Sequence, residues 1–209
     1  MTTISEVLSG VLRYFPNTMT ISLLLLGAML GKISWVLIAT GGIALTILIL
    51  TAQYAFGRAG FGEMPGAAVI QACSLLPVND GIYATLPSLW VALTTYYLAY
   101  ILTNAGNIYG AAPPKNISKN SIAVAQRKSV GIISIVSVSL LFLFFLVPRY
   151  MTNCETVAGL LLGLAIGAGM GVGWWYFLNA CNSEVYPDIH GVMIGLKPGA
   201  LHTSPMVCS

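Results

Sequence analysis

The chain has 209 residues, of which 57% are hydrophobic and only 7% charged. Soluble domains carry about 25% charged residues, so this composition excludes an ordinary soluble protein and predicts a membrane protein. The net charge of +3 is small and scattered, which argues against nucleic-acid binding, and the length suits one membrane domain over residues 1–209.

Apolar residues recur at helical spacing from 4 to 15, with polar residues between them. Thr3 and Glu6 have the spacing of a capping box, and Pro16 follows the last apolar position. The pattern predicts an amphipathic helix over 4–15 that ends at the proline and lies in the membrane surface. The alternative is a helix packed on a soluble core.

The next stretch, 18–54, is apolar apart from Lys32. As one helix it would be roughly 55 Å long, whereas the bilayer core is about 30 Å thick, so the chain must turn. We expect the turn at Gly31 and Lys32, with a first span over 18–30 and a second over 33–55. The first would be only about 20 Å long, so a re-entrant or tilted half-span is the alternative.

Residues 56–80 contain glycine and proline throughout and predict a surface loop or re-entrant segment. The third span is expected over 82–104 and the fourth over 130–147, ending at Pro148. A polar connector, 105–129, should join them.

The fifth span, 156–178, has no charge and a stripe of glycines at every fourth position: Gly159, Gly163, Gly167 and Gly171. This spacing puts the four on one helical face. Each glycine destabilises a helix by about 1 kcal/mol relative to alanine, so the stripe predicts that another helix packs against it. The aromatic triplet 174–176 should anchor the span at the membrane interface.

These elements predict an all-α integral membrane protein with about five transmembrane helices over 18–178, an N-terminal interfacial helix and an irregular C-terminal tail over 179–209. In this layout the connector 105–129 and Lys32 share the more basic side. The positive-inside rule therefore predicts that the connector faces the cytoplasm.

The same layout places Cys73 and Cys154 on one side of the membrane, and Cys181 and Cys208 on the other. Only disulfides within each of these pairs avoid reaching across the bilayer. Free thiols remain the simpler expectation, because no spacing here matches a secreted disulfide framework. The two histidines are isolated, so no metal site is expected.

Three residues with phosphate-binding or hydroxyl side chains fall on the non-cytoplasmic side: Arg58, Ser88 and Arg149. Their surroundings resemble the membrane-bound type-2 phosphatidic acid phosphatases, which carry K-x6-RP, PSGH and SR-x5-H-x3-D motifs. Arg58 is followed by Pro65, Ser88 lies in Pro-Ser-Leu-Trp, and Arg149 follows a proline shortly before the glycine-rich helix.

This resemblance implies a bound lipid phosphate but no catalysis, because the family needs one histidine as nucleophile and another as acid. Trp90 stands where the acid would be, and His190 and His202 lie in the tail. The alternative for the two arginines is interfacial anchoring.

A second resemblance rests on FGEMPGAAVIQACSLLP, PSLW, PRYMTNCE and the tail sequence VYPDIHGVMIGLKPGALHTSP. These segments look like a small multi-span membrane protein of the large double-stranded DNA viruses that infect algae and other protists. The resemblance implies a non-enzymatic, cofactor-free structural role in the internal membrane beneath the capsid. Its partners would be lipid and other membrane or capsid proteins.

The tail is apolar yet broken by glycine and proline, so it either stays disordered or lies along a partner in an assembly. Two function classes therefore remain: a structural membrane component, or an inactive lipid-phosphate-binding protein. Convergence of Arg58, Ser88 and Arg149 on one phosphate-sized pocket would favour the second class.

Overall fold

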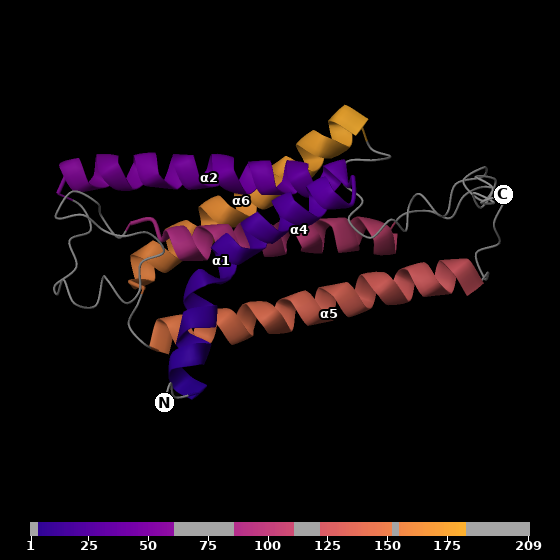
Figure 1. The fold of residues 1–209 in the computed structure, drawn as a ribbon, viewed down its shortest axis with the longest axis horizontal. Coiled ribbons are helices and arrows are strands. Elements are labelled where there is room, and N and C mark those ends of the chain that lie inside the picture. The colour runs from indigo at the N-terminus through magenta and orange to yellow at the C-terminus, as the bar shows by residue number, and fades with distance from the viewer. Residues whose placement is uncertain (1–3, 61–85, 111–121, 152–154, 183–209) are drawn as a thin grey trace.

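A computed structural model of the chain describes residues 4–60, 86–110, 122–151 and 155–182. All regular elements in these ranges are helices: α1 (Ile4–Met29), α2 (Ile33–Arg58), α4 (Leu89–Gly110), α5 (Ile122–Met151) and α6 (Val157–Asn182). The all-α expectation is therefore confirmed over the described ranges. Figure 1 shows α2, α4 and α5 extending lengthwise along the molecule, with α1 and α6 crossing at an angle.

Helices that follow one another in the chain, from α2 through α4 and α5 to α6, run in alternating directions (Figure 1). Near the end of α2, Gln53 donates a 2.8 Å hydrogen bond to the carbonyl of Pro87, which precedes α4. Arg149, in the last turn of α5, lies 2.7 Å from Glu155, which precedes α6. The ends of α2 and α5 and the starts of α4 and α6 thus share one end of the bundle, called the Arg149 end below. The opposite end is called the Lys128 end.

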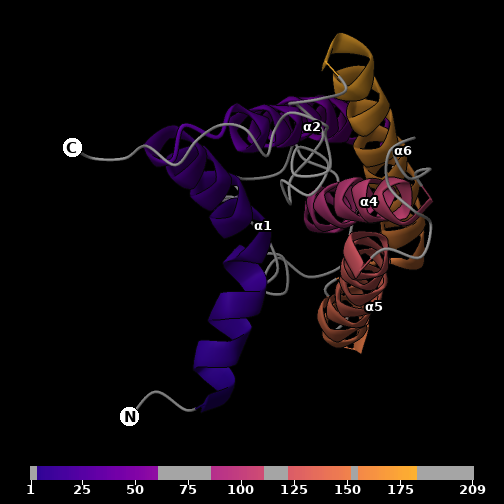
Figure 2. The same cartoon turned by 90° about the vertical axis from the view of Figure 1, so that its right-hand side faces the viewer.

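Helix α4 is the centre of the molecule. It contacts each of the other four helices, and Figure 2 shows it between α6 and α5. Its buried residues include Thr94, Thr95, Tyr96, Tyr97 and Tyr100, so the centre of the bundle carries many hydroxyl groups. The outer helices turn large aliphatic and aromatic side chains outward instead.

Three of the described helices are long and apolar enough to cross a membrane: 33–58, 124–151 and 157–181. The expected second and fourth spans fall within the first two of these helices, and the expected fifth span matches the third from 157 onward. Neither α1 nor α4 reaches that hydrophobicity, so the expected count of five apolar spans is not supported. In α4 the reason is its row of threonine, tyrosine and asparagine residues, which face other helices.

The prediction that Pro16 ends the first helix is wrong, because α1 continues through it to Met29. The separate elements expected over 4–15 and 18–30 are parts of this one helix, which bends between its two halves (Figures 1 and 2). Tertiary contacts hold the chain on both sides of the proline. The Phe15 ring stacks on Phe145 of α5 at 4.0 Å, and the hydroxyl groups of Thr20 and Tyr97 of α4 lie 2.6 Å apart.

The turn expected at Gly31 and Lys32 is confirmed. Gly31 has a φ of 64°, which glycine adopts without strain. The amide of Lys32 donates to the Gly27 carbonyl at 2.8 Å, and the amide of Gly31 to the Ala28 carbonyl at 3.5 Å. This pairing is the Schellman ending of a helix, and it reverses the chain within two residues.

The connector expected over 105–129 is too long at both ends, because α4 extends to Gly110 and α5 begins at Ile122. Helix α5 also includes Pro148, which was expected to end it. Helix α4 begins at Leu89, later than the expected 82, and α6 includes 179–182 of the expected tail. The polar residues at the ends of these helices were expected to lie in loops. In the structure they continue each helix beyond its apolar segment.

Candidate functional site

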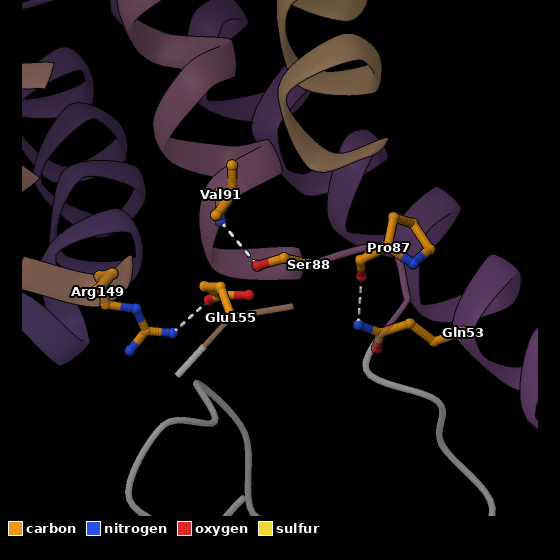
Figure 3. Close-up of polar contacts among 6 residues, drawn as sticks. All are labelled: Gln53, Pro87, Ser88, Val91, Arg149 and Glu155. Carbon is orange, nitrogen blue, oxygen red and sulfur yellow. Dashed lines mark hydrogen bonds and ion pairs between the residues drawn. The ribbon is translucent and has the colours of Figure 1, made fainter. Parts of the chain in front are cut away.

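The site predicted from Arg58, Ser88 and Arg149 lies partly at the start of α4. Ser88 is the N-cap of this helix, since its Oγ accepts a 3.2 Å hydrogen bond from the amide of Val91 (Figure 3). Its own amide donates to the carbonyl of Gly159 in α6 at 3.2 Å. Both contacts are structural, because they fix the start of α4 and attach it to α6.

Arg149 is buried at the end of α5, where its Nη2 lies 2.7 Å from Oε1 of Glu155 (Figure 3). Its guanidinium also lies 4.8 Å from the centre of the Trp90 ring in α4. The side chain therefore joins α5 to the segment before α6 and to the first turn of α4. In the phosphate-site prediction, a bound phosphate would neutralise the charge of Arg149. In the structure, the carboxylate of Glu155 neutralises it instead.

Arg58 is exposed at the end of α2, and its Nη2 donates a 2.7 Å hydrogen bond to the hydroxyl of Tyr54. Its guanidinium lies 5.2 Å from the centre of the same tyrosine ring. Arg58, Ser88 and Arg149 thus each have a different partner: a tyrosine, a backbone amide and a glutamate. Ser88 and Arg149 both lie close to Trp90, whereas Arg58 lies on the surface.

The predicted glycine face of α6 lies against α4. Gly159, Gly163, Gly167 and Gly171 are all buried, whereas Gly169 and Gly173 on the flank have open space where a side chain would be. A Cβ atom at Gly163 would lie 3.0 Å from the carbonyl oxygen of Ser88. At Gly167 and Gly171 an added Cβ would overlap backbone carbonyls of α4.

The carbonyls that face these glycines also follow one another at every fourth residue. Gly163 faces Ser88, Gly167 faces Ala92, and Gly171 faces Tyr96. Because the residue numbers rise together on both helices, α4 and α6 run parallel in fixed register. The glycine face therefore sets the closest helix contact of the bundle, as small residues do in membrane helices.

A second glycine contact, on α2, was missed by the sequence analysis. Gly41 and Gly42 leave space for Tyr96 and Tyr97 of α4, and Gly41 also for Trp174 of α6. The Tyr96 hydroxyl donates to the carbonyl of Ile38 at 2.8 Å. Adjacent glycines inside an otherwise apolar helix were the signal that could have revealed this contact.

The tryptophans of the 174–176 triplet, expected as an interfacial anchor, make hydrogen bonds to neighbouring helices. Nε1 of Trp174 donates to the carbonyl of Leu37 in α2 at 2.9 Å, and Nε1 of Trp175 lies 3.4 Å from Oδ1 of Asn104 in α4. Both indole N–H groups thus face the interior of the bundle. Tyr176 alone is largely exposed.

Cys181 is an exposed free thiol near the end of α6. Cys73, Cys154 and Cys208, with both histidines, lie outside the described residues, so the predicted disulfides concern segments without a structural description. Within the described ranges, no three histidine, cysteine or acidic side chains are grouped closely enough to hold a metal ion.

Comparisons of the chain with protein-family models, curated proteins and solved structures give no match.

Proposed function

We propose that this chain is a non-enzymatic structural membrane protein, whose helix bundle lies in a bilayer as a component of a larger assembly. The observation that carries the proposal is the distribution of polarity. The central helix α4 has hydroxyl groups along its length, whereas the peripheral helix α5 is apolar and contacts chiefly α4.

The exposed residues of α5 support a lipid environment. Ile133 and Leu140 are each 63% exposed, and Phe144 is 55% exposed. In water such a surface would be an extended apolar patch of the kind that monomeric soluble proteins rarely expose. In a bilayer the same side chains contact acyl chains, while the hydroxyl groups of α4 are satisfied or enclosed within the bundle.

The alternative, an inactive lipid-phosphate-binding protein, receives no support from the contacts of the three predicted residues. Phosphate recognition needs donors that converge on one anion. Here Arg149 is paired with Glu155, the Ser88 hydroxyl accepts from Val91, and Arg58 binds Tyr54 on the surface. These contacts favour structural roles for all three residues.

We propose the internal membrane of a large double-stranded DNA virus as the setting of this assembly, on the resemblance of the sequence alone. The tail sequence 185–209 would then bind a neighbouring membrane or capsid protein. Deletion of 185–209 should release the protein from purified particles while leaving its membrane insertion intact. Unchanged retention of the truncated protein in the particle would contradict the docking role.

The bilayer environment is tested by extraction of cell membranes carrying the full chain with alkaline carbonate, which removes peripheral proteins. The protein should remain in the pellet and be released by detergent. Each of Leu140→Lys and Phe144→Lys should raise the apparent free energy of insertion by about 2.5–3.5 kcal/mol, whereas alanine at these positions should have a much smaller effect. Carbonate-soluble protein, together with lysine variants that behave as the alanine variants do, would overturn the proposal.

A further inference from the structure

An open apolar groove lies between the end of α4 and the first half of α5. It is lined by Tyr109, Ile132, Ile135 and Val136 and has a volume of about 160 Å³. Tyr109, Ile132 and Val136 are each about half exposed, so these side chains present an accessible surface rather than a filled core.

The groove lies beside the closest contact of these two helices. A Cβ atom added at Gly131 would lie 3.1 Å from the carbonyl oxygen of Ala105 and 3.1 Å from the Cβ of Tyr109. The glycine therefore lets α5 approach the backbone of α4. The bulkier residues that follow it, Ile132 and Ile135, form one wall of the groove, and the Tyr109 ring forms the other.

A cationic side chain lies at one end of the groove. Nζ of Lys128 is 5.9 Å from the centre of the Tyr109 ring, and Lys128 is exposed one helical turn before Ile132. Lys128 is the charged side chain that the described part of the chain places at this groove, so an anionic ligand is the complementary one.

We propose that this groove binds one anionic phospholipid, with the phosphate at Lys128 and a segment of one acyl chain between Tyr109, Ile132 and Val136. The inference rests on the proposed bilayer environment and adds a specific lipid contact to it. Sites for drug-sized ligands have volumes of about 300–1,000 Å³, so a groove of 160 Å³ fits only part of a chain. A second copy of the protein would need about 800 Å² of buried surface on each partner, far more than four residues provide.

The test uses the full chain in nanodiscs that contain either phosphatidylglycerol or phosphatidylcholine, each with a small fraction of the same lipid bearing a photoreactive acyl chain. After illumination, mass spectrometry locates the labelled peptides. Phosphatidylglycerol should label the peptides containing Tyr109 and 132–136 preferentially. Lys128→Gln should reduce this labelling about fivefold, the factor expected for one lysine beside an anionic surface.

Lys32→Gln is the matched control, because Lys32 is also exposed at the Lys128 end, in the turn between α1 and α2, away from the groove. It should leave the labelling unchanged. Val136→Trp should fill the groove and reduce labelling at Tyr109 without disturbing α4, since Val136 is 51% exposed. Equal labelling of the wild type and Lys128→Gln, or equal labelling by both lipids, would each overturn the lipid site. A chain that fails to enter the nanodiscs would instead overturn the bilayer proposal on which the site rests.

Discussion

Arg149 and Glu155 form an ion pair whose side chains are only 8% and 7% exposed. Removing two charges from water is costly, and their attraction repays that cost only when the geometry is good and further contacts assist. Here the guanidinium also packs over Trp90. The pair thus fixes the last turn of α5 beside the starts of α4 and α6, across a connection of only five residues.

Breaking this pair should destabilise the bundle more than removing it entirely. Arg149→Met and Glu155→Leu should each lower the free energy of unfolding by about 3–5 kcal/mol, because each leaves one buried charge without its partner. The double variant should recover much of this loss. Thermal unfolding in detergent micelles measures the effect, and Arg58→Met, at an exposed site, is the control. A double variant as unstable as the sum of the two single variants would contradict this account.

At the scale of the helices, the contact between α4 and α6 depends on backbone proximity. The carbonyls of Ala92 and Tyr96 occupy the positions that side chains would take at Gly167 and Gly171. Glycine at these sites costs helix stability, and packing of two helices offsets the cost. Replacing glycine by alanine should therefore destabilise the protein on the face of α6 that packs against α4, but not on the face where space is open.

Gly167→Ala should destabilise the protein by about 1–3 kcal/mol, because the added methyl group meets the backbone of α4, which cannot rotate away. Gly169→Ala, two residues along the same helix, should be neutral or stabilising by up to about 1 kcal/mol, since space is open there and alanine favours a helix. Thermal unfolding in micelles compares the two variants. Equal destabilisation by both would show that glycine acts through flexibility rather than through packing.

The glycine face and the turn at Gly31 could be predicted from the sequence because each depends on local spacing or local conformation. The continuation of α1 through Pro16 could not, since it depends on the stacking of Phe15 on a residue of α5. Likewise, the structural role of Arg149 depends on Glu155 and Trp90, which approach it only after folding. Sequence spacing identified the arginine as notable, but tertiary contacts determine what it binds.

Over the whole molecule, each end of the bundle carries exposed basic residues. At the Arg149 end, Arg149 is neutralised by Glu155, and the exposed Arg58 lies over Tyr54. At the Lys128 end, Lys32 is exposed, and the exposed Lys128 lies over Tyr109. From the sequence we expect the connector after α4 to face the cytoplasm, and this orientation stays a prediction.

The orientation predicts opposite labelling of two engineered thiols. In a cysteine-free background, Lys128→Cys should react with a membrane-impermeant maleimide only after the cytoplasmic side is opened. Arg58→Cys should react from the outer side of intact cells or vesicles, because α2 ends at the Arg149 end. Labelling of both thiols from the same side would show that the bundle does not cross the membrane along its length.

The parallel pairing of α4 with α6 also has a consequence for biosynthesis. Helix α4 is synthesised well before α6, and α5 must be translated between them. At about 5–20 residues per second, several seconds therefore pass between the synthesis of α4 and that of the glycine face of α6, which packs against it. During that interval the nascent chain must be sheltered by the translocon or by the earlier hairpin of α1 and α2, and the bundle closes only once translation has reached its final helix.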